Sequence, residues 1–263
     1  MASFDLDAYL ARIGARRTDS VAALMLAHMA AIPFENLDVL LGRGVRVDLE
    51  SVVAKLVTAG RGGYCFEHGT LFQAALGALG IEATAHAARV LLVAPKPEAP
   101  RTHMFLTVED AGTTWVLDPG FGGSGPLVPV PLAEGQEAPH GRDVHRLVRR
   151  DGEWVLEGLM NGAMTPLWTS SFEPQFPVDF ALANHYVSTF PGSPFATRLM
   201  IRALTPDGRV SAMNRDVTTL RDGVAEKHQL ADRAELRALL ARHFGFDLPD
   251  VERLRVPTVP EWI

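Results

Sequence analysis

The sequence contains a single cysteine, Cys65, among 263 residues. One cysteine excludes an internal disulfide and a thiolate metal cage, because both need further sulfur atoms. The sequence also has no apolar run of about 18 residues, so we expect no membrane span. The N-terminus "MASFDLDAYL" is acidic where a signal peptide needs basic residues and then an apolar run. An unpaired thiol without an export signal predicts a cytoplasmic protein.

Positive charge is scarce as well. The net charge is −6, the isoelectric point is near 5.8, and no basic cluster stands out, so we expect no nucleic-acid partner. A hydrophobic content of 47% with 21% charged residues is typical of a folded globular protein. The length allows one large domain or two to three small ones. The sequence does not indicate an oligomeric state.

The hydrophobic pattern divides the chain into three parts. Helical spacing of apolar residues dominates the first eighty residues, in segments 18–33, 48–60 and 70–80, with Asp48 as an N-cap and Gly60 as a stop. From Ile81 the pattern changes to strands, with hairpins expected near residues 110–111, 151–152 and 207–208. The proline-rich segment 173–195 predicts a linker with a short helix, and segment 231–245 predicts a closing amphipathic helix. We therefore expect three domains, at residues 1–85, 86–190 and 191–263.

Cys65 lies where the glycine-rich turn "RGGYC" enters a helix. A helix N-terminus and a protonated histidine both favour the thiolate, which is the nucleophilic form of cysteine. Gly62 and Gly63 permit backbone conformations that other residues avoid, and they allow a substrate to approach the main chain. A small buried core residue is the competing interpretation, and it is the more common fate of a cysteine. No second ligand pair with zinc spacing accompanies Cys65, Glu67 and His68, so we expect no metal site.

His103 is the histidine best placed to act as the base. If "EDAG" closes a hairpin centred between residues 110 and 111, paired positions sum to 221 and His103 faces Asp118. Opposed residues of an antiparallel pair project to the same face, so the carboxylate would fix one ring nitrogen and leave the other free. A slip of one residue would separate the two side chains. Asp118 also has a simpler interpretation as a turn residue.

The other histidines have ordinary interpretations. They occupy a core position, an alanine-rich strand, a polar segment expected to be exposed, the charged C-terminal region, and a position three residues after Cys65; His185 stays ambiguous. In that order they are His28; His86; His140 and His145; His228 and His243; and His68. The residues thus favour a Cys65–His103–Asp118 triad without establishing it.

Five segments resemble the arylamine N-acetyltransferases. They are "IPFENLDVLLGR", "AGRGGYCFEHGTLF", "THMFL", "LDPGFGG" and "HYVSTFPGSPF", in that family's order and over nearly the whole chain. The resemblance implies an α+β fold with an N-terminal helical bundle, a central β-barrel-like domain and a C-terminal α/β lid around a cysteine-protease-like core. It implies Cys65 as the acyl-accepting nucleophile, His103 as its base and Asp118 as the orienting carboxylate. Acetyl-CoA would be the co-substrate, an aromatic amine, hydrazine or hydroxylamine would be the acceptor, and no metal would be required.

The resemblance also assigns positions around the triad. Phe121 and Phe195 would border the acceptor pocket, although core packing is the usual role of phenylalanine. Gly122 and Gly123 would lie where the pantetheine of CoA passes the backbone. The same resemblance implies a charge cluster beneath the active site, with the alternative of three solvated charges. Its members would be Arg12, Glu35 and Arg61.

Two positions depart from the family pattern, and three other functions remain open. Gly69 replaces an asparagine, and Pro119 follows Asp118 where many relatives have valine; either change would alter the pocket. One alternative is an amide synthase of the same fold that closes a polyketide macrolactam from a carrier-bound acyl chain. A second is a thiol hydrolase, which uses the same triad chemistry. A third is a non-catalytic relative, which the presence of all three candidate residues disfavours.

Overall fold

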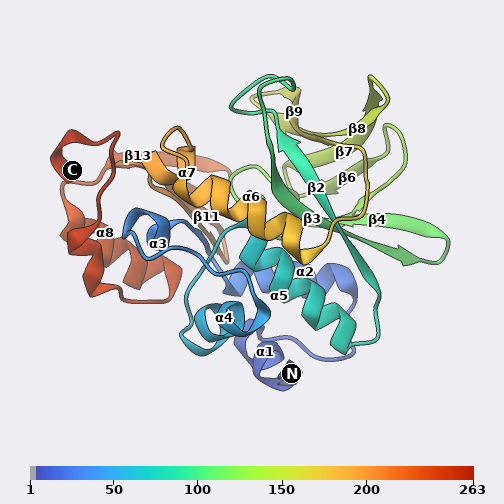
Figure 1. Cartoon of the computed structure of the whole chain (residues 1–263), viewed down its shortest axis with the longest axis horizontal. Coiled ribbons are helices and arrows are strands. Elements are labelled where there is room, and N and C mark those ends of the chain that lie inside the picture. The colour runs from blue at the N-terminus through green and yellow to red at the C-terminus, as the bar shows by residue number, and fades with distance from the viewer. Residues whose placement is uncertain (1–3) are drawn as a thin grey trace.

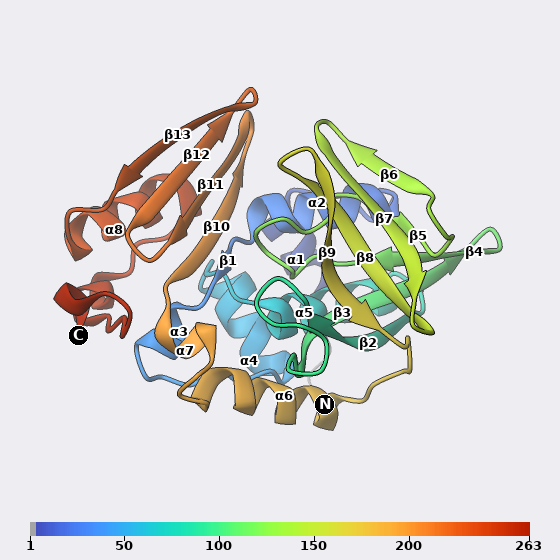
Figure 2. The ribbon, with the colours of Figure 1, turned by 90° about the horizontal axis from the view of Figure 1, so that it is seen from above.

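The computed structural model describes residues 4–263 and shows three groups of elements. Figure 1 shows helices α1, α2, α4 and α5 below a strongly twisted sheet, with a second sheet and α8 at the other end. Figure 2 shows the two sheets side by side with the N-terminal helices between them. This arrangement confirms the predicted α+β fold with its helical, β-barrel-like and α/β parts. The division at residues 85/86 and 190/191 stays a prediction.

One N-terminal helix begins after Asp48, the N-cap that the sequence predicts, and another begins after Ser20. Ser20 and Asp48 each accept a hydrogen bond from the backbone N–H three residues on, which satisfies an otherwise unpaired helix-start donor. The helix after Asp48 continues as a π-helical turn before it ends ahead of Gly60, which has a φ of 66°. The elements are α1 (Leu6–Ile13), α2 (Val21–Ala31), β1 (Phe34–Glu35), α3 (Leu37–Leu40), α4 (Leu49–Val53), η1 (Ala54–Thr58) and α5 (Cys65–Ala78).

The central sheet has eight antiparallel strands in the order β5-β4-β3-β2-β9-β8-β7-β6. A bridge between Glu134 and Leu147 links the β5 side to β7 and curls the sheet toward closure. Its interior contains aromatic side chains, among them Phe105 and Trp168, whose ring centroids are 4.5 Å apart. The strands are β2 (Ala83–Val90), β3 (Arg101–Asp110), β4 (Thr113–Leu117), β5 (Val130–Pro131), β6 (Glu137–His140), β7 (Asp143–Arg150), β8 (Glu153–Met160) and β9 (Ala163–Ser170).

The predicted register of the β3–β4 hairpin is wrong by two residues. Asp110 pairs with Thr113 and Leu106 with Leu117, so the turn consists of Ala111 and Gly112. Both turn residues have positive φ, at 50° and 79°, and glycine tolerates the second position best. An even shift preserves the face to which each side chain points. The hairpin at residues 151–152 has its expected register, whereas the turn near 207–208 consists of residues 206 and 207.

The C-terminal part is a second antiparallel sheet with helices on one side. Its order is β1-β10-β11-β12-β13, so the short N-terminal strand β1 forms one edge. Phe34 of β1 pairs with Arg202 of β10 and forms a bridge with Gly63, which ties this sheet to the glycine turn. The elements are β10 (Met200–Thr205), β11 (Gly208–Met213), β12 (Asp216–Arg221), β13 (Val224–Gln229), α8 (Arg233–Leu239), η2 (Leu240–Phe244), η3 (Pro249–Arg253) and η4 (Pro260–Trp262).

Segment 173–195 is more ordered than a linker. It contains a thirteen-residue helix, α6 (Pro177–Thr189), and a short helix, α7 (Pro194–Thr197). Pro177 occupies the first turn, where a missing N–H costs nothing, so the prolines delimit the helix and do not break it. Figure 2 shows α6 running along the outside of the N-terminal helices. Phe180 and Asn184 are buried there, which closes one side of the core around α5.

Candidate active site

Cys65 is the first residue of α5, as the sequence predicts, and is buried at 4% exposure. Glu67 accepts a hydrogen bond from the Tyr64 N–H at 3.0 Å and so stabilises the helix start. The glycine turn leaves no room for side chains, because a Cβ on Gly62 would lie 2.2 Å from the Pro33 carbonyl oxygen. The turn therefore needs glycine to present the thiol at the helix N-terminus.

The structure places His103 of β3 beside Asp118, directly after β4. His103 Nε2 lies 3.0 Å and 2.9 Å from the two Asp118 carboxylate oxygens, although the observed register makes the residues diagonal neighbours and not direct partners. Burial disfavours the charged ring, but the Asp118 charge and hydrogen bond outweigh burial and raise the pKa of His103 to about 10. The ring is an imidazolium at neutral pH.

Cys65 completes a contiguous group with this pair. Its side chain lies close enough to the His103 ring to add to the rise in the pKa of that histidine. Since Nε2 is engaged by Asp118, Nδ1 is the nitrogen that faces the sulfur. The sulfur also lies 3.7 Å from the Thr102 carbonyl oxygen. A thiol, an imidazole and a carboxylate in series can move one proton between sulfur and ring.

Trp168 is a member of this site that the sequence does not reveal. Its indole Nε1–H donates to Asp118 Oδ2 at 2.9 Å from β9, fifty residues away in the sequence. This bond and the contact to His103 leave the fully buried carboxylate with two donors. A buried aromatic with a polar N–H needs an acceptor, but only the tertiary structure shows which one.

The four predicted substrate-binding residues lie in two places. The Phe121 ring packs edge-on against His103 at a centroid distance of 5.1 Å. Phe195, from α7, lies 6.3 Å from the Phe34 ring and 5.2 Å from the Tyr64 ring, on the far side of the thiol's helix start. Gly122 and Gly123 continue from Phe121 with positive φ values of 71° and 21°. Both aromatic rings are half-buried, so each keeps an accessible portion.

The predicted charge cluster has a different membership. Arg61 pairs with Glu35 at 2.6 Å, as expected, and Lys55 binds both Asp38 and Glu67 at 2.8 Å. Lys55, Asp38 and Glu67 are further members that the sequence did not predict, because the spacing of these charges along the chain does not show that they lie close together. Burial raises the pKa of Glu67 to about 7 against the opposing effect of Lys55. The cluster holds the glycine turn against the start of α5.

Arg12 lies outside this cluster. Its guanidinium donates to the backbone carbonyls of Leu56 and Gly60 at 3.1 Å and 3.0 Å. Those carbonyls belong to the end of η1, where a helix leaves acceptors unpaired. Arg12 therefore supports the same glycine-rich segment by capping a helix, without an ion pair to Glu35 or Arg61.

The chain is similar to known proteins along nearly its whole length. A family model described as N-acetyltransferase matches residues 18–253. An arylamine N-acetyltransferase of Mycolicibacterium smegmatis is 34% identical, over 95% of this chain and 94% of that one. The chain belongs to the arylamine N-acetyltransferase family.

Two further relatives extend this family comparison. A Salmonella typhimurium protein named arylamine N-acetyltransferase / N-hydroxyarylamine O-acetyltransferase is 35% identical, over 96% of this chain and 92% of that one. The solved structure of the Mycobacterium marinum arylamine N-acetyltransferase in complex with CoA has a TM-score of 0.88 and 35% identity. It is matched over 94% of both chains. The likeness therefore spans all three parts of the fold.

The departures from the arylamine N-acetyltransferase pattern now have a structural setting. A Cβ on Gly69 would lie 2.7 Å from the Met104 sulfur, so the space of the missing side chain is filled from β3. Pro119 lines a small cavity beside His68 and Gly122. Neither position contacts the Cys65 sulfur directly. Both adjoin residues next to the triad, which is where a change would alter the shape of the pocket.

The structure contradicts the prediction for His145 and agrees with the prediction for His68. His145 is buried at 3% exposure and hydrogen-bonds the Ser124 carbonyl, so the expectation of an exposed residue is wrong. Strand β7 turns it inward beneath the loop that follows Asp118. His68 does not serve the sulfur, as expected, because its Nδ1 hydrogen-bonds His28 Nε2 at 2.9 Å.

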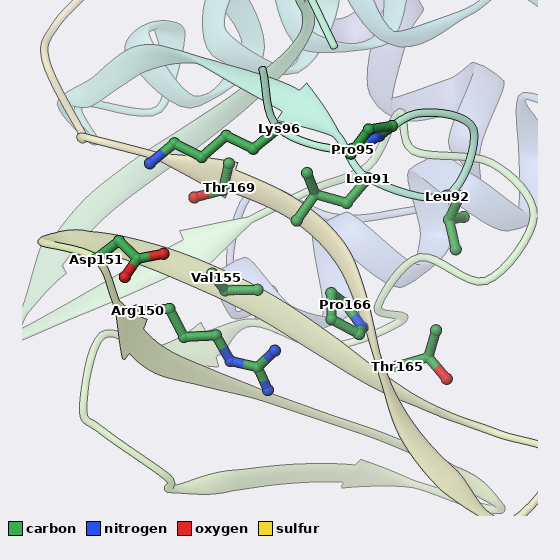
Figure 3. Close-up of a pocket in the computed structure, with 10 residues that line it drawn as sticks. All are labelled: Leu91, Leu92, Pro95, Lys96, Arg150, Asp151, Val155, Thr165, Pro166 and Thr169. Carbon is green, nitrogen blue, oxygen red and sulfur yellow. The ribbon is translucent and has the colours of Figure 1, made fainter. Parts of the chain in front are cut away.

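A cavity of about 410 Å³ lies away from the thiol, between the loop after β2 and strands β8 and β9. Figure 3 shows the apolar side chains Leu91, Val155 and Pro166 within it and Lys96 and Arg150 at its edges. Both cations are paired with carboxylates, Lys96 with Glu153 and Arg150 with Glu157. Its ten lining residues do not include the triad, so volume alone does not identify the reactive centre of this family member.

Within residues 4–263 no three His, Cys, Asp or Glu side chains are grouped so as to hold a metal ion. In the same part of the chain, no helix combines the length and apolar character needed to cross a membrane.

Proposed function

We propose that this chain transfers an acetyl group from acetyl-CoA to an arylamine, arylhydrazine or N-hydroxyarylamine, through a thioester on Cys65. The observation that carries the proposal is the position of Cys65 at the start of α5, close to a His103 ring that is itself held by Asp118. The M. marinum relative whose structure contains CoA and the named activities of the Salmonella relative support the choice of donor and acceptor. The reaction is ping-pong, because the acyl group rests on the enzyme between substrates.

In the first half-reaction, the Cys65 thiolate attacks the carbonyl carbon of acetyl-CoA. The new carbon–sulfur bond forms while the carbonyl π electrons move to oxygen. When the oxyanion collapses, the bond to the CoA sulfur breaks, and the His103 imidazolium gives its proton to that leaving sulfur. Since Cys65 is the first residue of α5, its backbone N–H lacks an intrahelical partner and is a suitable donor to the oxyanion.

In the second half-reaction, the acceptor nitrogen attacks the thioester carbon. His103, now neutral, takes a proton from that nitrogen, and the bond to Cys65 breaks with the electron pair returning to sulfur. The thiolate–imidazolium pair is restored, and the N-acetyl product leaves. Asp118 stays ionised throughout and keeps Nδ1 of His103 directed at the reacting atoms.

Residues around the triad would select the substrates. Phe121, packed on His103, and Phe195, across the helix start, offer aromatic surface to an aryl acceptor. Gly122 and Gly123 leave the backbone open to a close-passing pantetheine chain. The cluster of Arg61, Glu35 and Lys55 would hold the glycine turn, so Arg61→Ala should reduce soluble yield and activity together.

The single thiol of this chain, Cys65, needs a reducing environment to stay reactive, which supports a cytoplasmic location.

The decisive experiment combines acyl mapping with a substrate panel. The protein is incubated with acetyl-CoA and longer acyl-CoA donors, and peptide mass spectrometry locates the acyl group. Anilines, hydrazines and hydroxylamines are then added, and product formation is followed. We expect acetyl on Cys65, release by aromatic amines, and no label in Cys65→Ala; unchanged turnover in that variant would refute the proposal.

The same panel separates the two remaining alternatives. An amide synthase would be acylated slowly by acetyl-CoA and rapidly by a polyketide-like carrier thioester. A thiol hydrolase would release free acetate as fast without an amine as with one. His103→Gln is the matched control, because it leaves the thiol in place and removes the proton acceptor.

A further inference from the structure

Two buried side chains with unpaired nitrogen atoms line the same small cavity. His68 Nε2, Arg202 Nε and Arg202 Nη2 are buried, and residues 4–263 provide no hydrogen-bond partner for them. The cavity has a volume of about 20 Å³, enough for one water-sized species. Apolar side chains of α2, β1 and β10 and the loop from Pro119 to Gly122 close it. Unpaired polar atoms are rare in protein interiors, so this group needs an explanation.

Within residues 4–263, Arg202 is a buried cation that makes no direct ion pair. Its Nη1 donates to the Gly122 carbonyl at 2.6 Å, and the side chain is 5% exposed. The acidic residue that favours its charge is Asp143, which already binds Arg209 Nη1 at 2.9 Å. Burial lowers the pKa of Arg202 to about 10, so the guanidinium stays charged at neutral pH. A charge in this setting is costly unless an anion compensates it.

His68 ends a chain of hydrogen bonds that starts at Tyr9. The Tyr9 hydroxyl lies 2.9 Å from His28 Nδ1, and His28 Nε2 lies 2.9 Å from His68 Nδ1. Burial lowers the pKa of both histidines, that of His68 to about 4, so each ring is neutral and carries one N–H.

The Tyr9 hydroxyl sets the direction of donation along these hydrogen bonds. Within the described residues His28 is the partner of the buried Tyr9 hydroxyl, so the reverse direction would leave the Tyr9 proton without an acceptor. Tyr9 therefore donates to His28, His28 donates to His68, and the His68 proton sits on Nε2. The carbonyls of Pro33 and Gly63 lie near this ring and favour its protonated form, and each also accepts one backbone N–H.

We propose that this cavity binds one small monovalent anion of the halide type, held by the N–H groups of Arg202 and His68. The unpaired buried side-chain atoms of its lining residues are all nitrogen atoms of Arg202 and His68, and Arg202 carries a charge. A water molecule would accept two of these hydrogen bonds, but it would leave the charge of Arg202 uncompensated. An anion accepts from all sides and neutralises Arg202. It would brace the Pro119–Gly122 loop, which follows Asp118, from beneath.

The test uses the unmodified protein and two variants of Arg202. Crystals grown in sodium bromide are measured at the bromine absorption edge, and thermal unfolding is compared in chloride and in gluconate at equal ionic strength. We expect an anomalous peak between Arg202 and His68. We also expect a Tm about 3 °C higher in chloride at tenfold excess over its Kd. Gluconate is too large for the cavity and serves as the control anion.

Arg202→Met should abolish both the peak and the chloride-specific rise in Tm, whereas Arg202→Lys should retain a weaker form of each. Density without anomalous signal would identify water and overturn the proposal. A bromide peak without a chloride-specific change in Tm would mean binding at crystal concentration only, which would also overturn it. If Arg202→Met does not fold, the two measurements on the unmodified protein still decide the question.

Discussion

His103 lies close to Cys65, and His68 follows Cys65 by three residues in α5; both histidines are almost fully buried, at 3% and 1% exposure. Their pKa values nevertheless move in opposite directions, to about 10 for His103 and to about 4 for His68. Burial disfavours the charged ring in both cases. The difference is the Asp118 carboxylate, which contacts His103 through two oxygens, whereas the ring partner of His68 is a neutral histidine. Burial makes a histidine neutral, and a fixed counter-charge makes it a proton store.

The strongest test of this contrast replaces each histidine in turn. His103→Gln should lower the rate of Cys65 acylation about 10⁴-fold, because it removes the group that shares the thiol proton. His68→Gln should lower that rate less than about tenfold, although it disturbs a buried hydrogen bond and reduces stability. Single-turnover acylation with acetyl-CoA measures both. An equal loss in a well-folded His68→Gln protein would show that His68 also takes part in the chemistry.

Asp118→Asn should convert His103 into a histidine of the His68 kind. The acylation rate at neutral pH should fall about 10³-fold, because the ring loses its charge and its fixed orientation. NMR titration of the imidazole should show the His103 pKa falling from the raised value to below 6.5. Trp168→Phe is the control, since it removes one hydrogen bond to the carboxylate and keeps the charge. A His103 pKa unchanged in Asp118→Asn would contradict the electrostatic explanation.

The pH dependence of stability gives a third test. Because the folded pKa of His103 lies above 6.5, its proton stabilises the fold fully below pH 6.5, and this contribution is lost as pH rises through about 10. A Cys65→Ser background prevents thiol ionisation from masking the effect. Between pH 6.5 and 10, Cys65→Ser should lose on the order of a few kcal/mol more stability than Cys65→Ser/His103→Gln. Parallel curves from urea unfolding would exclude a raised pKa.

The contact between Gly69 and Met104 sets the spacing between the two histidines, since each residue directly follows one of them in the sequence. Gly69→Ala should lower the acylation rate about tenfold by displacing Met104 and the adjacent His103 from the thiol. The exchange also favours the helix by up to about 1 kcal/mol, so Tm should change little. Adding Met104→Val should restore the rate. A slow double mutant would mean that Gly69 acts through something other than this contact.

The smallest effect on activity is expected at Tyr9, where the hydrogen bonds through His28 to His68 begin. Tyr9→Phe removes the hydroxyl that donates to His28 and should cost about 1 kcal/mol of stability. Acetyl transfer should change less than about twofold, because neither His28 nor His68 shares the thiol proton. Urea unfolding and steady-state rates measure the two effects separately. A large loss of rate without a loss of stability would show that the Tyr9–His28–His68 hydrogen bonds contribute to the chemistry at Cys65.

Local patterns in the sequence predict much of the reactive group. A glycine pair before an apolar helical pattern placed Cys65 at a helix start, because helix boundaries depend on residues within one turn of each other. The prediction that His103 and Asp118 lie together did not require an exact strand register. The predicted register was off by two residues, but strand side chains alternate with a period of two, so both still point to one face.

Contacts between distant segments were not predictable in the same way. Trp168 reaches Asp118 from another strand, and Lys55 joins two carboxylates that spacing does not relate to it. His145 was expected at the surface, because its neighbours are polar, yet β7 buries it. In each case the partner is chosen by how the sheets and helices pack, which leaves no periodic trace in one chain.

The sequence by itself determined the order of the three parts, the position of the thiol at a helix start, and the presence of a histidine and a carboxylate on one face of a hairpin. These follow from capping, periodicity and the two-residue repeat of strands, all of which act over short distances. Only the tertiary structure decided which buried histidine holds a proton. Protonation depends on desolvation and on the nearest counter-charge, and both are set by residues that meet only when the chain is folded.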